Sequence, residues 1–309
     1  MSTHYRTCHL CEAMCGLAIE VEGETIVKVR NDPDDPFSQG YCCPKGLAIG
    51  ELHHDPERLK RPLVRDGGVL REATWEEALE RASDGLARII RRDGRNAVGV
   101  YLGNPVVHNL GATLGVEAWR RVLGTRNRFS ANSQDVNPHL LANHLMFGAQ
   151  LSHPVADLDR CMFLLVLGAN PLASNGSMMT AAGVGKRLRG IQSRGGRVVV
   201  IDPRKTETAQ LADAHHTIKP GRDGLLLLSL AQEICAADLW DRDWLAQHAS
   251  GVERLPELLA PFTPDRVAPC LGSDLTAADI RELARTLATA KGAAVYTRLG
   301  VCVTEFAGL

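Results

Sequence analysis

Residues 161–171 read CMFLLVLGANP, an apolar run of strand length that ends in glycine and proline. Such a run, bounded by turn residues, is typical of a strand that is buried on both faces. RVVVID (197–202) follows it with the same character. HHTIKP (215–220) is also predicted as a strand, and GAAVYTRLG (292–300) is a last candidate. These four runs predict the sheet that decides the fold.

The segments between these runs predict helices, which begin near Asn175, Gly224 and Asp274. Strands that alternate with helices are typical of parallel sheets, because each parallel connection must return along the sheet before the next strand begins. Residues 136–309 are therefore predicted to form a doubly wound, Rossmann-like α/β domain.

A further α/β segment is predicted over residues 61–135. TWEE (74–77) has the Thr-x-x-Glu pattern of a capping box and opens an amphipathic helix that runs to about Arg92. AVGVYLG (97–103) predicts a buried strand, and a helix follows from near Asn109. We treat this segment as an incomplete domain.

Residues 1–60 predict a small β-rich domain. GLAIEVEGETIVKV (16–29) alternates apolar and polar residues on both sides of a central Glu-Gly-Glu, which predicts a β-hairpin. NDPDDPFSQG (31–40) is a run of Asp, Pro, Ser and Gly and predicts a loop. Its aspartates lack the ligand spacing of a calcium loop, so we expect them to form turns.

Cysteines dominate this first domain. Five of the nine in the chain lie within the first 43 residues, spaced Cys8-x2-Cys11-x3-Cys15 and then Cys42-Cys43. Three thiolates within eight residues can bind three corners of a compact iron–sulfur cubane, and a distant fourth completes it. Structural zinc sites, the competing interpretation, usually take their ligands as two separated pairs. The spacing favours a 4Fe–4S cluster and leaves the fourth ligand open between Cys42 and Cys43.

Composition limits the partners. The formal net charge is −1, so bulk charge gives no argument for binding nucleic acid or an anionic membrane surface. No apolar run approaches the roughly 18–20 residues that span a bilayer, and the N-terminus lacks the apolar core of a secretory signal. We therefore expect a cytoplasmic protein with no membrane insertion, whose thiols stay reduced.

The cysteine spacing, followed by Cys43-Pro44-Lys45-Gly46, resembles the cluster motif of the dimethyl sulfoxide reductase family of molybdopterin oxidoreductases. That family includes formate dehydrogenases and nitrate reductases. The likeness continues in order along the chain, in RLKRPLVR, TWEEAL, GANP, IDPRKTETA and KPGRDGLLL. It implies one 4Fe–4S cluster and a bis-molybdopterin guanine dinucleotide (bis-MGD) that carries molybdenum or tungsten. Its Cys-x-Lys-Gly pattern implies that Lys45 lies between cluster and pterin, and that the cluster ligands are Cys8, Cys11, Cys15 and Cys43.

Turn residues follow three of the predicted strands, at the edge where open α/β sheets bind ligands. A glycine there lets backbone amides approach a phosphate, and a carboxylate can accept hydrogen bonds from a ribose or a guanine. The resemblance implies contacts to the guanine dinucleotide from Gly168, Asn170, Asp202, Arg204, Gly221 and Asp223. A tight turn at Gly168, an ion pair at Arg204 and a helix cap at Asp223 are the alternatives.

The resemblance also implies one side-chain ligand to the metal. In SANSQDVNPH (130–139), Asp135 falls at that position, where formate dehydrogenases have cysteine or selenocysteine followed by histidine. A carboxylate is a harder donor than a thiolate and suits an oxidised metal, which favours oxygen-atom transfer of the nitrate or oxide reductase kind. A one-residue gap would instead place Gln134 or Ser133 there. Asp135 is equally a candidate N-cap for the following helix.

Other functions stay open beside an oxygen-atom transferase, the first being a formate dehydrogenase-like catalytic subunit. Glu12 directly follows Cys11, and a non-redox tungsten hydratase of the same superfamily uses an acidic residue beside a cluster cysteine. Burial there could make the carboxyl a general acid, and an exposed glutamate with no role is the alternative. The family's later domains have no counterpart here, so a third function is an electron-transfer or assembly fragment. We expect a small-molecule substrate, a redox protein or subunit as partner and, for a fragment, a second chain that completes the pterin site.

Overall fold

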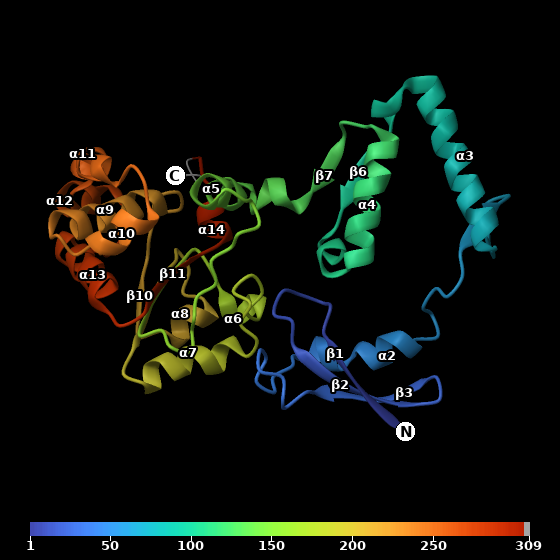
Figure 1. Ribbon diagram of the computed structural model, residues 1–309, viewed down its shortest axis with the longest axis horizontal. Helices are drawn as coiled ribbons and strands as arrows, with labels where there is room; N and C mark the ends of the chain where they lie inside the picture. The colour runs from blue at the N-terminus through green and yellow to red at the C-terminus, as the bar shows by residue number, and fades with distance from the viewer. Residues whose placement is uncertain (306–309) are drawn as a thin grey trace. The chain divides into compact units, whose positions relative to one another are not determined.

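The computed structural model describes residues 1–305. The chain divides into two compact units, Met1–Ser133 and Gln134–Leu309, which are described in turn (Figure 1).

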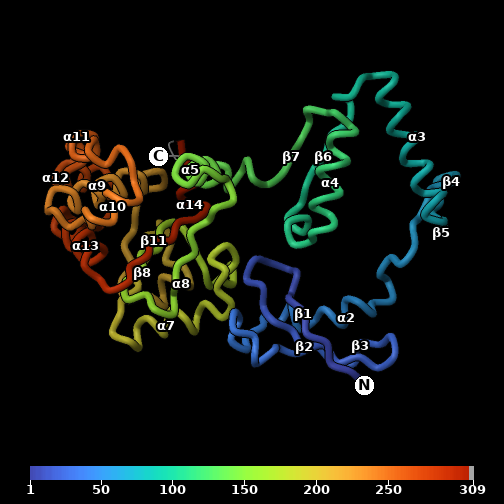
Figure 2. The backbone as a smooth tube through the Cα atoms, viewed as in Figure 1, coloured from blue at the N-terminus to red at the C-terminus, as the bar shows by residue number. Residues whose placement is uncertain are grey.

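The second unit, whose backbone runs from green to red in Figure 2, is built on the predicted parallel sheet. Its strands are β8 (Phe163–Leu167), β9 (Arg197–Ile201), β10 (Ala214–His216) and β11 (Ala293–Thr297), in the order β10-β9-β8-β11. All three pairings are parallel. The chain moves outward from β8 to β10 and then returns to place β11 on the other side of β8. The strand order therefore reverses between β8 and β11, and such a reversal opens a crevice at the carboxyl ends of the strands.

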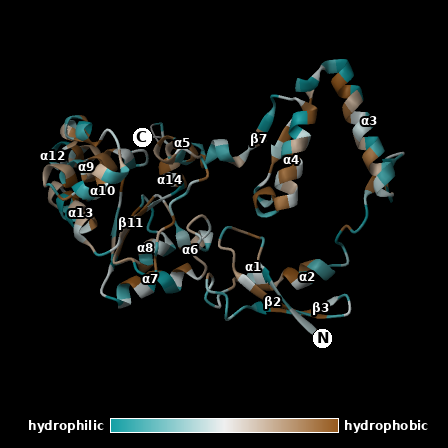
Figure 3. Ribbon diagram, in the orientation of Figure 1, coloured by the Kyte–Doolittle hydropathy of each residue, from teal (hydrophilic) through white to brown (hydrophobic). Residues whose placement is uncertain are grey.

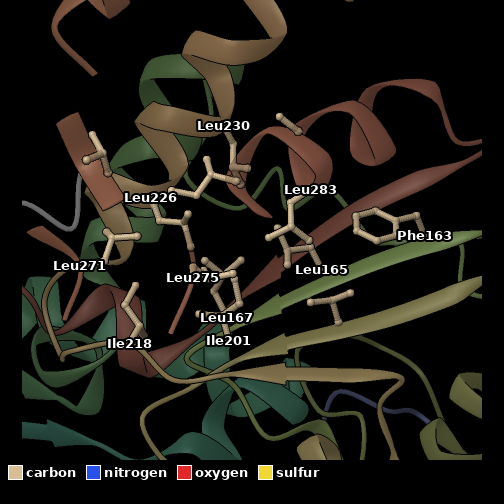
Figure 4. Packing of buried hydrophobic residues seen from close by; sticks show 14 residues of the cluster. Phe163, Leu165, Leu167, Ile201, Ile218, Leu226, Leu230, Leu271, Leu275 and Leu283 are labelled. Carbon is tan, nitrogen blue, oxygen red and sulfur yellow. The ribbon is translucent and has the colours of Figure 1, made fainter. Parts of the chain in front are cut away.

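Helices cover both faces of this sheet, so the doubly wound prediction is confirmed. Leu164 and Val166 of β8 pack against α7 (Val184–Ser193) on one face. On the other face, Leu165 and Leu167 pack against α9 (Asp223–Ala236) and α13 (Ala277–Thr289), as Figure 4 shows. Alternate side chains of one strand thus enter two separate cores, which is why β8 is apolar at every position.

The remaining helices of this unit are short. The helix predicted to begin at Asn175 is wrong, because Asn175 ends α6 with φ +56° and the next long helix begins only at Val184. Left-handed φ angles at Met178 and Thr180 also keep this stretch out of a helix. Besides α5 (Asn137–Phe147), which is about as long as α7, the shorter helices are α6 (Pro171–Ser174), α8 (Glu207–Leu211), α10 (Arg242–His248), α11 (Leu255–Leu259), α12 (Pro264–Val267) and α14 (Leu299–Cys302).

The first unit begins with a three-stranded antiparallel sheet. The predicted hairpin is confirmed as β2 (Gly16–Glu22) and β3 (Thr25–Asn31), and β1 (Ser2–Thr7) adds a strand that the sequence did not predict. The loop after β3 is also confirmed, since its aspartates accept backbone hydrogen bonds within their own turns. Two short helices follow, α1 (Pro44–Leu47) and α2 (Ile49–His54).

The predicted helix after residue 74 is confirmed as α3 (Trp75–Asp93). It follows an unpredicted hairpin of β4 (Leu63–Asp66) and β5 (Val69–Glu72). Thr74 caps the helix by accepting a hydrogen bond from the Glu77 backbone nitrogen at 3.2 Å. The Glu77 carboxylate instead accepts hydrogen bonds from Arg71, so only one half of the expected capping box forms.

The last part of this unit is a two-stranded parallel sheet. Its strands are β6 (Val100–Leu102) and β7 (Arg128–Ser130), connected through the predicted helix, α4 (Leu110–Leu123), which Asn109 caps. The strand prediction is confirmed here, but the expected burial is wrong, because Tyr101 is 71% exposed. Within residues 1–305, α3 also has no buried residue, although hydrophobic residues recur along its length (Figure 3).

Candidate cofactor sites

The first candidate site is the loop that joins β1 to β2. It carries Cys8, Cys11 and Cys15, and the Cys8 nitrogen donates a hydrogen bond of 2.8 Å to the Cys15 carbonyl, which closes the loop. Met14 adopts a left-handed φ of +49° inside it. The loop is therefore a tight turn that holds Cys8 and Cys15 buried and Cys11 partly exposed.

Cys42 and Cys43 reach the same place from the segment between β3 and α1. Cys43 is the N-cap of α1, and its carbonyl accepts hydrogen bonds from the nitrogens of Gly46 and Leu47. Gly46 is buried, and a Cβ placed on it would lie 2.5 Å from the Cys42 Sγ and 3.4 Å from the Cys8 Sγ. Only glycine leaves room for these two sulfurs.

All five cysteines lie close enough to interact electrostatically. The pKa values of Cys8 and Cys11 are raised, chiefly by burial and further by the neighbouring thiolates. The Cys15 pKa is lowered to about 7, mainly because the Cys42 thiol donates a hydrogen bond to its sulfur, and the same bond raises the pKa of Cys42. A cationic iron–sulfur core would relieve the repulsion that this many thiolates impose on one another.

The donor set fits an iron–sulfur cluster. Four thiolates suffice for one cubane, and five thiols are within electrostatic reach of one another here. No three His, Cys, Asp or Glu side chains in residues 1–305 lie close enough to share a single metal ion. A cubane does not require that, because each thiolate binds a different iron. Lys45 lies exposed in the first turn of α1, two residues beyond Cys43.

Glu12 is held by a partner that the sequence did not reveal. Its carboxylate lies 3.8 Å from Nε2 of His108, and both side chains are mostly shielded from solvent. The same imidazole nitrogen lies 3.3 Å from Nδ2 of Asn104. The alternative of an exposed glutamate is therefore wrong. His108 is almost a hundred residues away in sequence, and no spacing pattern connects the two.

The second candidate site is the carboxyl edge of the parallel sheet, where β8 and β11 end side by side. Gly168 has φ +53°, and its carbonyl accepts a 3.0 Å hydrogen bond from the Gly300 nitrogen. A Cβ on Gly168 would lie only 2.9 Å from the Gly300 Cα. The two glycines let the chain turn away sharply at the point where the strand order reverses. The sequence predicted Gly168 at this edge but not Gly300.

Asn170 and Arg204 are both engaged by Glu207. Nδ2 of Asn170 donates to the Glu207 carboxylate at 2.6 Å, and its Oδ1 accepts from the Thr208 hydroxyl at 2.7 Å. Arg204 lies 3.7 Å from the same carboxylate, with both side chains well exposed. The ion-pair alternative for Arg204 is thus present in the structure. Asn170 fastens the loop after β8 to the start of α8.

Two carboxylates follow the end of β9 and open α9. Asp202 follows β9, and its Oδ1 accepts from the Arg204 nitrogen at 2.9 Å. Asp223 is only 4% exposed, and its pKa is raised mainly by burial and further by the charge of Asp202. The capping alternative for Asp223 is wrong, because Arg222 is the N-cap of α9. Gly221, with φ +82°, forms the turn just before that helix.

Asp135 lies between a 3-10 turn and α5. The capping alternative for Asp135 is wrong, since Val136 is the N-cap of α5 and no side chain caps that helix. Cys302 lies in α14, a helix that contacts α5. Burial raises the pKa of the Cys302 thiol, and the negative charge of Asp135 raises it further. The positive charge of Arg298, which follows β11, lowers the same pKa. The sequence did not indicate that Arg298 and Cys302 belong near Asp135.

The comparisons with known proteins identify the family of the chain. Residues 58–276 match the family described as Molybdopterin oxidoreductase, and residues 1–55 match the Molybdopterin oxidoreductase Fe4S4 domain. The chain belongs to the molybdopterin oxidoreductase family. Its membership implies a 4Fe–4S cluster and a molybdopterin cofactor.

Curated members of the family match nearly the whole chain. Formate dehydrogenase H of Escherichia coli K12 is 28% identical over 306 residues, which cover 97% of this chain and 41% of that protein. A nitrate reductase of Symbiobacterium thermophilum is also 28% identical, with 93% and 38% covered. The chain thus spans about two fifths of the length of these relatives.

A solved structure shows the same fold. Acetylene hydratase from Pelobacter acetylenicus superposes with a TM-score of 0.79 at 22% identity, over 98% of this chain and 41% of that one. The predicted fold class, a small antiparallel β domain followed by parallel α/β structure, is therefore confirmed. No helix within residues 1–305 has the length and apolar character needed to cross a bilayer.

Proposed function

We propose that this chain is the N-terminal part of a cytoplasmic oxidoreductase that binds one 4Fe–4S cluster and a bis-MGD with molybdenum or tungsten. The cluster ligands in this proposal are Cys8, Cys11, Cys15 and Cys43. The gathering of the cysteine loop around the start of α1 is the observation that carries the proposal. When bound, the cluster supplies one-electron transfer and the pterin-held metal supplies two-electron redox chemistry.

The chain's own residues would hold these groups by ordinary recognition. The four thiolates bind iron, and the exposed ammonium of Lys45 adds a positive charge beside them. At the sheet edge, Gly168 and Gly221 leave the backbone free to approach phosphate, and the carboxylates of Asp202 and Asp223 suit the donor edge of a guanine. Asn170 and Arg204 act there through Glu207, which positions the loop.

We further propose oxygen-atom transfer, of the kind named by the nitrate reductase relatives, as the reaction of the whole enzyme. The support is Asp135, which caps no helix and offers a hard carboxylate donor to the metal. The partners in this proposal are a small oxygen-bearing substrate, an electron-transfer protein and a polypeptide that completes the pterin site. Formate oxidation is the competing reaction, since formate dehydrogenases are among the relatives.

The test is anaerobic purification followed by measurement of iron, sulfide, zinc, molybdenum and tungsten per chain. We expect about four irons with matching sulfide, together with pterin and molybdenum or tungsten. Zinc in place of iron would contradict the proposal. Nitrate and formate turnover with a viologen dye, measured on the loaded enzyme, then separates the two reactions.

A further inference from the structure

The loop between β10 and α9, residues 217–221, is fastened to the segment just before α13. Asp274 makes the fastening, since its Oδ1 accepts hydrogen bonds from the Thr217 nitrogen at 2.8 Å and from the Thr217 hydroxyl at 3.0 Å. Its Oδ2 lies 3.1 Å from Nδ1 of His216, the last residue of β10. The Ser273 hydroxyl donates to the Thr217 carbonyl. Two successive residues at the end of a strand are thus bound by one carboxylate.

Buried side chains hold the two segments against each other. Ile218, Leu271 and Leu275 are almost fully buried in the core that Figure 4 shows. The Lys219 nitrogen donates a 3.1 Å hydrogen bond to the Leu271 carbonyl. Gly272 has φ +56°, and a Cβ on it would lie 3.0 Å from the Lys219 Cβ. Apolar packing therefore fixes the inner side of the β10–α9 loop and leaves its exposed side to the carboxylate.

Both carboxylates of the candidate guanine site are connected to this loop. The Asp202 nitrogen donates a 3.1 Å hydrogen bond to the His216 carbonyl. The Lys219 carbonyl accepts a 3.1 Å hydrogen bond from the Arg222 nitrogen, which forms the turn into α9 and leads directly to Asp223. Binding groups work only when they are held to within roughly 0.5 Å of their productive places. A shift of the β10–α9 loop would therefore disturb both carboxylates.

The ionised form of Asp274 suits this task. Partial burial opposes its ionisation, but the hydrogen bonds from Thr217 and the contact with His216 lower the pKa of this carboxyl overall. An ionised carboxylate only accepts hydrogen bonds, and its two oxygens can serve several donors together. An asparagine would keep one acceptor oxygen for Thr217, whereas an alanine would keep none.

We propose that Asp274 is a positioning residue for the guanine dinucleotide, which fastens the β10–α9 loop and so holds Asp202 and Asp223 in place against the guanine. This inference rests on the proposed function, because it requires that the dinucleotide binds at this edge of the sheet. Asp274 has no need to touch the ligand, since it acts through the loop.

The experiment measures the binding of guanosine diphosphate (GDP) and adenosine diphosphate (ADP) to the pterin-free chain by isothermal titration calorimetry. Asp274→Ala should weaken GDP binding about tenfold, because Thr217 loses its acceptor and the loop can shift. ADP binding should weaken less, since adenine lacks the paired N–H donors that two carboxylates recognise in guanine. The preference for GDP over ADP should therefore narrow. Asp274→Asn keeps an acceptor oxygen and should bind GDP nearly as the wild type does.

Asp241→Ala is the matched control. It also removes an exposed carboxylate, which caps α10 by accepting a 2.9 Å hydrogen bond from the Trp244 nitrogen. It should lower the urea midpoint of the chain and leave the preference for GDP unchanged. Thr217→Val is a milder variant for the case that Asp274→Ala does not fold. It removes one of the hydrogen bonds to Asp274, and its GDP affinity should fall about threefold.

The outcomes separate this inference from the proposal beneath it. Unchanged GDP affinity in Asp274→Ala, or equal losses for GDP and ADP, would overturn the positioning role alone. Losses of GDP affinity that are the same in Asp274→Ala and Asp241→Ala would overturn it as well, because stability would then explain them. A wild-type chain that binds no GDP would overturn the guanine site of the proposed function, and the role of Asp274 with it.

Discussion

The nitrogen of Gly300 donates a 3.0 Å hydrogen bond to the carbonyl oxygen of Gly168, although Gly168 follows β8 and Gly300 lies in α14, about 130 positions later. This bond closes the sheet edge where the strand order reverses. It exists only because neither residue has a side chain, as a Cβ on Gly300 would lie 2.7 Å from the Gly168 Cα. The edge proposed to bind the guanine dinucleotide thus depends on a contact between two backbones.

Gly300→Ala should therefore destabilise the second unit. The added methyl group meets the backbone of Gly168, which cannot move aside as a flexible side chain would. We expect a loss of about 1–3 kcal/mol in the free energy of unfolding, measured by urea denaturation, and reduced retention of pterin. Gly224→Ala is the matched control, because a Cβ there meets nothing within 4 Å. Equal stability of the two variants would show that the close approach is not required.

Asn170→Ala should destabilise the chain without any ligand present. It removes the hydrogen bonds to Glu207 and to Thr208, and Thr208 is fully buried. We expect a loss of about 1–3 kcal/mol, the usual result of leaving a buried polar group without its partner. Arg204→Ala removes only an exposed ion pair and should cost about 0–1 kcal/mol. Urea denaturation of the pterin-free chain measures both. A larger loss of unfolding free energy in Arg204→Ala than in Asn170→Ala would contradict this prediction.

Asp223→Asn should stabilise the pterin-free chain at neutral pH. Burial raises the folded pKa of Asp223 above its unfolded value, so the folded state binds the proton more tightly. Its ionisation therefore subtracts stability as pH rises from the unfolded pKa, about 3.9, through the folded pKa. The advantage of Asp223→Asn should appear above that window and vanish below it, in urea midpoints measured across pH.

Asp279→Asn is the control of opposite sign. Asp279 completes the capping box of α13, and the hydrogen bonds that it accepts from Thr276 lower its pKa. Its stabilisation is present above the unfolded pKa and is lost as pH falls through the folded one. Asp279→Asn should therefore be less stable than wild type at neutral pH and approach it in acid. If both variants shift in the same direction at neutral pH, burial of Asp223 is not what raises its pKa.

Asp135→Ala should change the spectrum of the metal and leave the stability of the pterin-free chain nearly unchanged. The reason is that Asp135 caps no helix, so its proposed task is only to bind the metal. Electron paramagnetic resonance of the loaded protein and urea denaturation of the pterin-free chain make the two measurements. Gln134→Ala and Ser133→Ala are the matched variants. A spectrum altered by either of them, but not by Asp135→Ala, would move the ligand position by one or two residues.

Local patterns predicted the strands and the capped helices well. The strand β8 and the hairpin of β2 and β3 followed from apolar runs and alternation. The start of α7 was missed because several residues between Asn175 and Gly183 adopt left-handed φ angles, which composition does not show. The burial of β6 was also wrong. An apolar run shows that a strand can be covered, but not whether a covering layer is present.

Spacing predicted the cysteine site for a similar reason, since three of its proposed ligands lie within one short loop. The remaining partners come from distant segments. Gly300 reaches Gly168 only through the strand order of the sheet, and His108 reaches Glu12 from the 3-10 turn after β6. No local pattern reports such contacts. Topology, which decides them, follows from the packing of whole elements.

The exposed pair of strands β6 and β7 has a practical consequence for work on this chain. Tyr101 and Phe129 are exposed cross-strand neighbours, and within residues 1–305 no third strand pairs with either edge of this small sheet. An open edge beside exposed aromatic rings is a template for self-association between molecules. At the high protein concentrations that spectroscopy requires, aggregation should begin at the β6–β7 sheet. A lysine on the outward face of either strand would suppress it without touching a single cysteine.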